Sequence, residues 1–213
     1  MDDGPVVVVL AAGRGARFDA AQRGLGHKLA QPFGGSTVLG STLAQVAASG
    51  LPHVVVTTAA LRPLAGGCIA DEDLLLLPPI EGSAPTRGMG DSIAAGVMAR
   101  PHAAGWLLLP GDLPLIQAET LRTVAAALAG HLLVYAQHHG RRGHPVGFDK
   151  AFFSELAALH GDEGARRMLA RYPARAVEVP DAGVRMDLDT VADLESLRAV
   201  YAARSTEGQV ASP

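Results

Sequence analysis

The chain of 213 residues is poor in several residue types, and each shortage argues against a class of protein. Its single cysteine, Cys68, excludes an internal disulfide and favours a reducing compartment. Aromatic residues make up only 4% of the sequence, so we expect a core of alanine, valine and leucine. The net charge of −3 argues against a nucleic-acid partner, because nucleic-acid-binding domains are usually basic.

Long hydrophobic runs and targeting signals are also missing. No apolar run approaches the ~20 residues of a membrane-spanning helix. The acidic N-terminus lacks the positive region and cleavage site of a signal peptide. We therefore expect a cytoplasmic protein with no membrane partner. The length suits a single domain, predicted over residues 1–204, with a polar and disordered tail at 205–213.

Apolar runs of strand length alternate with segments of helical spacing over the first 140 residues. Strands are expected at 5–10, 54–58, 74–77, 106–109 and 132–136, and helices at 38–48, 92–100 and 118–129. This alternation predicts βαβ units. The predicted fold class is α/β, a single-domain Rossmann-like architecture with a mostly parallel sheet flanked by helices.

The pattern is less regular beyond residue 140. Residues 141–148 are expected to form a loop that runs into a short strand, and 184–188 a second short strand. Thr190-Val-Ala-Asp193 is a capping box that opens a last helix, expected to end near residue 203. Shorter elements are expected at 152–159, 163–171 and 176–179.

The most informative stretch is residues 6–17, which read Val-Val-Val-Val-Leu-Ala-Ala-Gly-Arg-Gly-Ala-Arg. A continuous apolar run is typical of a strand buried on both faces. The turn Gly13-x-Gly15 lets the backbone approach a ligand and offer N–H groups. Positive charge follows at Arg14 and Arg17. A strand, a glycine loop and cations together predict a phosphate site.

Two better-known glycine loops do not fit these residues. The dinucleotide fingerprint needs a third glycine where this chain has Phe18, and the Walker A lysine is absent. Lys28 is one of only two lysines against sixteen arginines, so a compact point charge stands where arginine is otherwise the rule. The alternative interpretation of the loop is a surface turn with incidental arginines.

Candidate acidic residues follow the expected strand at 106–109 and lie in the segment at 187–189. An apolar strand over 106–109 delivers Asp112 at its carboxyl end, where α/β sheets bind ligands. Facing a triphosphate, this carboxylate would hold Mg²⁺. Asp187 and Asp189 alternate along an expected strand, so both would point to one face, and Asp187 is the preferred second metal ligand. The alternatives are that Asp112 and Asp189 cap helices.

Two further motifs add candidate binding residues. Gly88-Met-Gly-Asp-Ser92 leads into a helix and could present N–H groups to a phosphate or a base, or simply cap that helix through Asp91. Arg142 and His144 place a cation and an imidazole near each other, which suits capture of an acceptor phosphate. The alternative for this pair is a solvated loop.

Taken together, the motifs resemble the molybdenum-cofactor nucleotidyltransferases, and Leu-Ala-Ala-Gly is similar to the branch that uses CTP. The matching pieces are Leu10-Ala-Ala-Gly-x-Gly-x-Arg17, Lys28-Leu29, Gly88-Met-Gly-x-Ser92, Gly111-Asp-x-Pro114, Arg142-Gly-His-Pro-Val-Gly147, Gly161-Asp-x-Gly-Ala-Arg166 and Asp187-x-Asp-Thr190. One departure from the family pattern is the spacing between Arg17 and Lys28. It is eleven residues here, whereas the family usually has about five, and residues 19–26 resemble an insertion. A second is Val191-Ala192, where the family tends to have Pro-Glu.

The resemblance implies a fold like that of the nucleotide-diphospho-sugar transferases and transfer of CMP from CTP to molybdopterin. It implies catalytic roles for Arg17, Lys28 and Asp112, acceptor binding by Arg142 and His144, and Mg²⁺ on Asp112 and Asp187. The nucleotide-binding residues would be Leu10, Ala11, Ala12, Gly13, Arg14, Gly15, Gly88, Gly90 and Ser92. A molybdoenzyme or its maturation factor is an expected transient partner.

Two other functions stay open at this point. The same scaffold could transfer GMP or another nucleotide to a different phosphorylated acceptor. The protein could also deliver molybdopterin to an apo-enzyme without catalysis, although the presence of both Lys28 and Asp112 favours an enzyme. Likeness of fold does not decide between these substrates.

Overall fold

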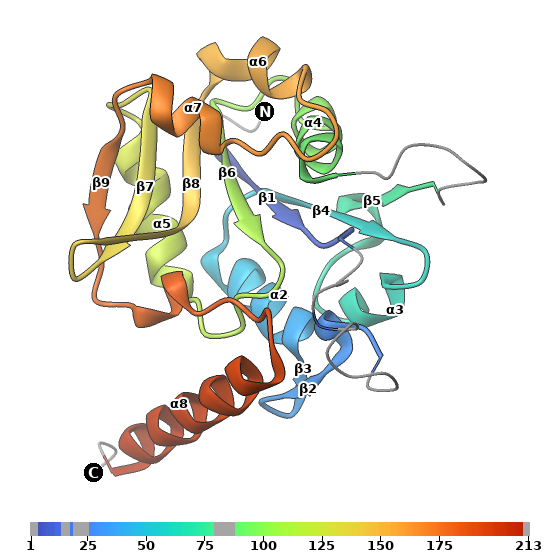
Figure 1. The fold of residues 1–213 in the computed structure, drawn as a ribbon, viewed down its shortest axis with the longest axis vertical. Helices are drawn as coiled ribbons and strands as arrows, with labels where there is room; N and C mark the ends of the chain where they lie inside the picture. Colours follow the sequence, from blue (N-terminus) through green and yellow to red (C-terminus); the bar gives the residue numbers. More distant parts are fainter. Residues whose placement is uncertain (1–3, 14–17, 19–25, 79–87, 211–213) are drawn as a thin grey trace.

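A seven-stranded sheet forms the centre of the molecule (Figure 1). The computed structural model describes residues 4–13, 18, 26–78 and 88–210. The strand order is β5-β4-β1-β6-β8-β7-β9, and only β8 runs antiparallel to its neighbours in this sheet. The strands are β1 (Pro5–Leu10), β4 (His53–Thr58), β5 (Leu74–Leu77), β6 (Gly105–Pro110), β7 (Leu133–His138), β8 (Arg141–Asp149) and β9 (Arg175–Glu178). The mostly parallel α/β sheet is confirmed.

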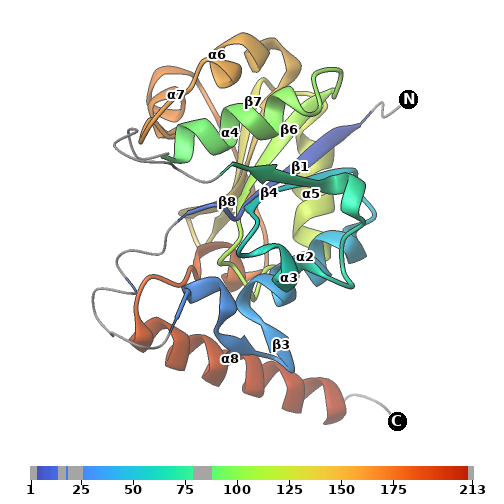
Figure 2. The same ribbon diagram turned by 90° about the vertical axis from the view of Figure 1, so that its right-hand side faces the viewer.

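Helices cover both faces of the sheet, with α4, α6 and α7 on one side and α2, α3, α5 and α8 on the other (Figure 2). A small hairpin, β2 (Pro32–Phe33) and β3 (Ser36–Thr37), lies beside α8. The helices are α2 (Val38–Ser49), α3 (Arg62–Ala65), α4 (Met89–Met98), α5 (Ala118–Leu128), α6 (Phe153–Ala157), α7 (Arg166–Arg171) and α8 (Val191–Val210). Single 3-10 turns are η1 (Lys28–Ala30), η2 (Asp71–Asp73), η3 (Lys150–Phe152) and η4 (Ala182–Arg185).

The valine run of β1 explains why the sheet needs two layers of helices. Val7 and Val9 belong to the core shared with α2 and α5, whereas Val6 and Val8 belong to the core shared with α4. All four side chains are fully buried. A strand whose alternate side chains both enter a core must be continuously apolar, so the unbroken run marks a central strand.

The segment after residue 140 differs from the expected loop. Residues 141–149 form the nine-residue strand β8, which pairs with both β6 and β7. Glycine and proline within the segment hide its strand character. A Cβ at Gly143 would meet the carbonyl of Val184, and one at Gly147 would lie 2.7 Å from Val134. Glycine is therefore used here because neighbouring elements pack closely on the strand.

The strand expected at 184–188 is also absent. Residues 182–185 form η4, and residues 186–189 belong to no strand. The buried carboxylate of Asp181 accepts hydrogen bonds from the N–H of Gly183 at 2.9 Å and the hydroxyl of Thr120 at 2.9 Å. This local capping favours a turn over an extended strand, and it ties the turn to α5.

The capping box that opens α8 is confirmed. Asp193 accepts a hydrogen bond from the N–H of Thr190 at 2.6 Å, and the Thr190 hydroxyl accepts one from the N–H of Asp193 at 3.2 Å. The helix continues to Val210, past the end expected near residue 203. The division into a domain at 1–204 and a tail at 205–213 stays a prediction. Within the described residues, no helix is both long and apolar enough to cross a bilayer.

Candidate active site

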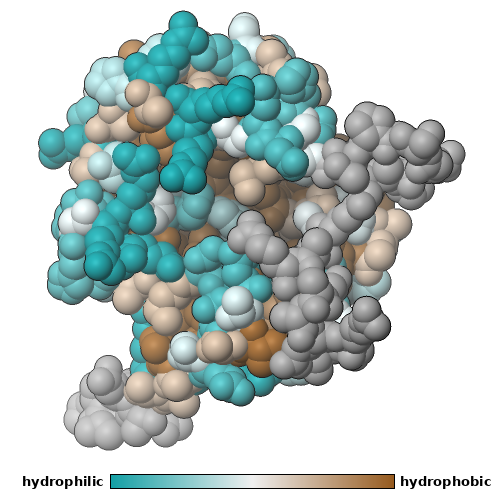
Figure 3. All heavy atoms as spheres, viewed as in Figure 1, coloured by the Kyte–Doolittle hydropathy of each residue, from teal (hydrophilic) through white to brown (hydrophobic). Residues whose placement is uncertain are grey.

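The carboxyl ends of β1 and β6 lie next to each other and carry the candidate site. Leu10 at the end of β1 pairs with Pro110 at the end of β6, and the N–H of Gly111 donates to the carbonyl of Leu10 at 3.0 Å. Asp112 directly follows Gly111, at this same edge of the sheet. Figure 3 shows this face of the molecule hollowed near its centre, with hydrophobic residues inside the hollow and hydrophilic residues on its left.

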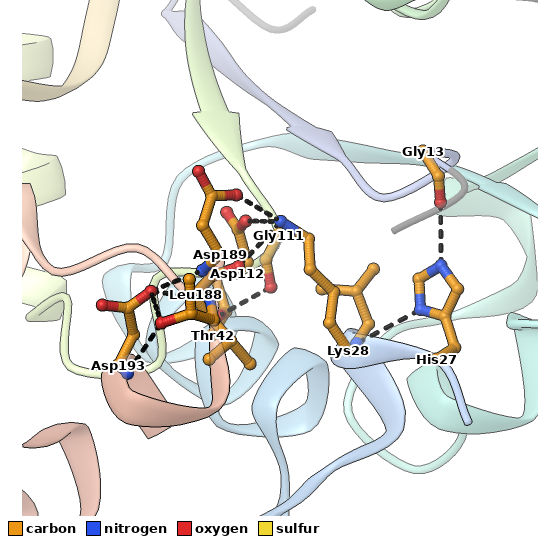
Figure 4. A network of polar contacts seen from close by, with 11 residues as sticks. Gly13, His27, Lys28, Thr42, Gly111, Asp112, Leu188, Asp189 and Asp193 are labelled. Carbon is orange, nitrogen blue, oxygen red and sulfur yellow. Dashed lines mark hydrogen bonds and ion pairs between the residues drawn. The ribbon is translucent and has the colours of Figure 1, made fainter. Parts of the chain in front are cut away.

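Lys28 is the centre of the polar network at this edge (Figure 4). Its ammonium donates to Asp112 Oδ2 at 2.6 Å, to the carbonyl of Leu188 at 2.8 Å and to Asp189 Oδ1 at 3.2 Å. These partners come from the segment after β6 and from the segment before α8. Three parts of the chain that lie far apart in sequence are thus joined by one cation.

His27 explains how Lys28 reaches the sheet despite its long spacing from β1. The imidazole Nδ1 accepts from the N–H of Leu29 at 3.2 Å, which caps η1, and Nε2 lies 2.8 Å from the carbonyl of Gly13. Because a carbonyl only accepts, Nε2 carries the proton. The ring therefore fastens the turn that carries Lys28 to the residue where the glycine loop begins.

The cluster holds Lys28 in its charged form. Burial by itself lowers the pKa of the ammonium, but the Asp112 and Asp189 carboxylates outweigh burial and raise its pKa above the ordinary value. Side-chain exposure falls from 36% at Asp189 to 18% at Lys28 and 11% at Asp112. The Lys28–Asp112 contact is therefore the more sheltered half of the cluster.

Two buried polar atoms beside this cluster have no hydrogen-bond partner among the described residues, Asp112 Oδ1 and His144 Nδ1. Buried polar atoms are nearly always paired with protein or water. Unsatisfied buried atoms of this kind, one just after β6 and one within β8, are candidates for contact with a ligand. Burial lowers the pKa of His144, although the charges of Asp112 and Asp187 oppose this, so the imidazole is neutral at neutral pH.

The two acids after η4 differ in their surroundings. Asp189 is paired with Lys28, and its N–H donates to the Asp193 carboxylate at 3.2 Å. Burial raises the pKa of Asp187, and the charges of Asp112 and Asp189 raise it further. The pKa of Asp187 thus responds to the charge of Asp112. The strand expected to carry Asp187 and Asp189 on one face is absent, because residues 186–189 belong to no strand.

The glycines at the start of α4 are occupied by packing. The N–H of Gly88 donates to the Asp91 carboxylate at 2.8 Å, and the N–H of Gly90 donates to the carbonyl of Gly161 at 2.9 Å. Asp91 also accepts from the N–H of Gly161 at 3.0 Å. The N-cap of α4 is Gly88, and Asp91 lies inside the helix at its third position, where its carboxylate closes a capping box on the N–H of Gly88. Neither glycine N–H is free for a phosphate. Ser92 is buried in the same turn.

The acceptor candidates lie on β8. The guanidinium of Arg142 stacks over the ring of Tyr135, 4.5 Å from its centroid, and the Arg142 side chain is exposed. His144 lies two residues further along the same strand, where the pairing of β8 with β7 shifts register. The expectation that this pair lies on a solvated loop is therefore wrong, because both residues belong to strand β8, which pairs with β7.

Other expected site residues are placed less completely. Leu10, Ala11, Ala12 and Gly13 lie at the end of β1, whereas Arg14, Gly15 and Arg17 fall outside the described residues. His27 was not among the candidates, although it stands directly before Lys28. Its partner Gly13 is fourteen residues away, and no spacing rule in the sequence signals that contact.

The donor set suits a hard divalent cation. In the part of the chain that the structure describes, no group of three or more His, Cys, Asp or Glu side chains could hold a metal by itself. Mg²⁺ usually takes one or two carboxylates and completes its shell with water and phosphate oxygens. Asp112, with its unpaired Oδ1, and Asp187 nearby fit this mode of binding.

Comparison with known proteins agrees with this architecture. The Rv0371c protein of Mycobacterium tuberculosis H37Rv superposes with a TM-score of 0.74 at 27% identity, covering 93% of this chain and 99% of that one. A further structure of Rv0371c, described as a complex with manganese, gives a TM-score of 0.72 at 28% identity, with 93% and 100% covered.

Two curated relatives differ in how much they share with this chain. Purine catabolism protein PucB of Bacillus subtilis is 28% identical over 207 residues, or 90% of this chain and 94% of PucB. Phosphoenolpyruvate guanylyltransferase of Rhodococcus erythropolis is 32% identical over 114 residues, or 50% of this chain and 47% of that enzyme. This second match therefore spans about half of each protein.

A family model, the MobA-like NTP transferase domain, matches residues 7–179. That range begins in β1 and ends just after β9, so it includes every strand of the central sheet. It also includes Lys28 and Asp112. The chain therefore belongs to the MobA-like NTP transferase family and is a nucleotidyltransferase.

Proposed function

We propose that the protein transfers CMP from CTP to the terminal phosphate of molybdopterin, or of its metal-loaded form, and releases pyrophosphate. The observation that carries the nucleotidyl-transfer part is the Lys28–Asp112–Asp189 cluster at the carboxyl ends of β1 and β6. The choice of CTP and molybdopterin rests on the motif resemblance, above all on Leu10-Ala-Ala-Gly13.

The reaction needs positioning and charge neutralisation more than covalent help. An oxygen of the acceptor phosphate attacks the α-phosphorus in line, the new P–O bond forms, and the bond from the α-phosphorus to pyrophosphate breaks. The acceptor phosphate is already ionised at neutral pH, so no general base is required. Lys28 would stabilise charge at the α-phosphate, and the backbone of Gly13–Ala16 together with Arg17 would bind the β- and γ-phosphates. Arg14 is a further candidate for nucleotide binding.

A divalent cation, Mg²⁺ in the proposal, would be held by Asp112 and Asp187, with Asp189 as the other candidate for the second position. When bound, such a cation neutralises phosphate charge. The support comes from the oxygen donors, from the unpaired Asp112 Oδ1, and from the manganese complex of Rv0371c. The protein's own part is to keep the Asp112 carboxylate sheltered at the edge of the sheet, whereas Asp187 is exposed.

Arg142 and His144 would face the acceptor. The exposed guanidinium suits a phosphate, because it presents several N–H donors in a fixed plane. The neutral imidazole could donate or accept one hydrogen bond. Ser92, with Gly88 and Gly90 shaping its turn, is proposed to help place the nucleotide through the position of α4 rather than through free glycine N–H groups.

A second candidate is transfer of GMP to another phosphorylated acceptor. The match to a phosphoenolpyruvate guanylyltransferase, which covers 50% of this chain, favours this second candidate. A non-catalytic role, in which the protein hands molybdopterin to a molybdoenzyme or its maturation factor in the cytoplasm, is the third. Both alternatives keep the same fold and differ in what occupies the hollow.

One set of incubations separates these functions. The protein is mixed with Mg²⁺, each of the four nucleoside triphosphates in turn, and either molybdopterin or phosphoenolpyruvate, and pyrophosphate release is measured. Release with CTP and molybdopterin supports the proposal. Release with GTP and phosphoenolpyruvate supports the second candidate, and tight molybdopterin binding without pyrophosphate from any nucleotide supports the carrier.

A further inference from the structure

The ammonium of Lys28 has no proton left for a phosphate. An ammonium has three N–H donors. Lys28 directs them to Asp112 Oδ2, the Leu188 carbonyl and Asp189 Oδ1 at 2.6, 2.8 and 3.2 Å. The residue proposed to contact the α-phosphate is therefore fully engaged with the protein. Any contact between Lys28 and a nucleotide requires at least one of these three hydrogen bonds to break.

The same contact occupies the carboxylate proposed to hold the metal. Asp112 is the most sheltered acid of the cluster, and one of its two oxygens is taken by the ammonium. A divalent cation on the other oxygen would share this sheltered carboxylate with the positively charged ammonium of Lys28. Repulsion between like charges is strong where screening by water is weak. Lys28 and a metal ion therefore compete for Asp112.

The turn that carries Lys28 need not move for this competition to be resolved. His27 holds η1 to Gly13 through Nε2 and caps the turn through Nδ1. The lysine side chain has four flexible methylene groups beyond this anchor. A rotation of these groups can release Asp112 while the backbone of η1 stays in place.

We propose that Lys28 is an internal counter-cation that excludes divalent metal from Asp112 until a triphosphate draws the ammonium away. The inference rests on the proposed function in taking Asp112 as a metal ligand. It adds an order of events, since the protein without nucleotide binds metal poorly and the cation enters together with the triphosphate. It also gives Lys28 a role before any chemistry begins.

The test is a titration of the nucleotide-free protein with Mn²⁺, with free Mn²⁺ measured by electron paramagnetic resonance. Lys28→Met removes the charge and keeps the length of the side chain, and we expect it to bind Mn²⁺ about tenfold more tightly than the wild type, or better. Lys28→Arg keeps a positive charge and should bind as weakly as the wild type. Lys150→Met is the matched control, because Lys150 is the other lysine of the chain and is exposed on η3.

A double variant shows where the metal sits. The gain in Mn²⁺ affinity of Lys28→Met should vanish when Asp112→Asn is added. Equal affinity for wild type and Lys28→Met overturns the inference, and so does a gain that survives Asp112→Asn. Thermal melting followed by circular dichroism checks that the variants fold, and Lys28→Gln replaces Lys28→Met if the latter does not.

A companion titration keeps this result apart from the proposed function. In the presence of a non-hydrolysable CTP analogue, wild-type protein should bind Mn²⁺ tightly and Asp112→Asn should not. If Asp112→Asn still binds the metal with the analogue, the metal assignment in the proposed function is wrong. If only the nucleotide-free comparison fails, the metal site stands and the counter-cation role of Lys28 is wrong.

Discussion

Two stretches of this chain are spelled alike, Gly13-x-Gly15 and Gly88-x-Gly90, and their described glycines serve different purposes. A Cβ at Gly13 would meet no atom within 4 Å. At Gly90 it would lie 2.7 Å from the carbonyl of Glu163, and at Gly88 it would meet the backbone of Gly161. The first glycine is open and the second pair is a packing surface. The same local pattern takes its meaning from its tertiary neighbours.

The region around the open glycine also carries the charges. Gly13, Lys28 and Asp112 are linked through His27 and through the ion pair at 2.6 Å. Around Gly88 and Gly90, by contrast, the polar groups satisfy one another, with Asp91 joining α4 to Gly161. A surface with unpaired buried atoms suits a ligand, whereas glycine N–H groups that already donate to the protein offer nothing to a phosphate. The following predictions test this difference.

The largest expected effect is at the charged region. Asp112→Ala should lower kcat by about a thousandfold or more, equivalent to about 4 kcal/mol of transition-state stabilisation, because a metal ligand is lost. The melting temperature should change little, because Lys28 keeps Asp189 and the Leu188 carbonyl as partners. Pyrophosphate release and thermal melting measure the two quantities. Near-normal turnover would remove Asp112 from the proposed mechanism.

At the packed region, the expected effect is on stability. Gly90→Ala forces a methyl group against the backbone of His160 and Glu163, at 2.7–2.8 Å, which cannot rotate away. Such overpacking costs about 1–3 kcal/mol, against a gain of at most ~1 kcal/mol in helix propensity. Urea unfolding should show a lower free energy of unfolding. An unchanged value would mean that the 160–163 segment yields easily, and the contrast with Gly13 would be lost.

The buried imidazole of His144 adds a pH dependence to stability. Its pKa is lowered by burial in the folded protein, while the unfolded chain binds the proton near pH 6.5. Below pH 6.5 the unfolded state holds more protons, so stability falls as pH falls toward the folded-state pKa, by at most ~1.4 kcal/mol per pH unit. His144→Gln should reduce this loss in urea titrations at several pH values. His102→Gln, at an exposed histidine, is the matched control.

The smallest effect on stability is expected at Gly13. Gly13→Ala adds a methyl group into open space and has no left-handed backbone to strain, so the free energy of unfolding should change by less than about 1 kcal/mol. If the loop lies close to a phosphate, the Michaelis constant for the nucleotide should nevertheless rise, because the methyl group blocks that approach. Loss of stability without a change in nucleotide binding would reverse the assigned roles of the two glycine motifs.

Much of the fold could be predicted because its signals are local. The valine run marked β1 as a central strand, and Thr190 with Asp193 marked the start of α8. Strand β8 could not be predicted in the same way, since Gly143 and Gly147 carry no hydrophobic signal. Their small size is required by Val184 and Val134, which reach the strand from elsewhere in the chain. When a strand is set by the elements that pack on it, its own residues carry little sequence signal for a strand.

The candidate site also has a part that local sequence signals predict and a part that depends on distant contacts. Asp112 and Lys28 could be named from their place after a strand and from the rarity of lysine, and the structure brings them within 2.6 Å. The sequence could not show that Asp189 is a second acidic partner of Lys28. It also could not show that the His27 imidazole bonds to the carbonyl of Gly13. Both depend on contacts between segments separated by up to 161 residues.

The sequence by itself determined most element types over the first 140 residues, the parallel core and the residues able to carry charge, because these follow from neighbours a few positions apart. Only the tertiary structure decided which glycine is open and which carboxylate holds the lysine. It also decided which polar atoms remain unsatisfied. Those properties depend on distances between chain segments, and hydrogen bonding and close packing act only once such segments have met.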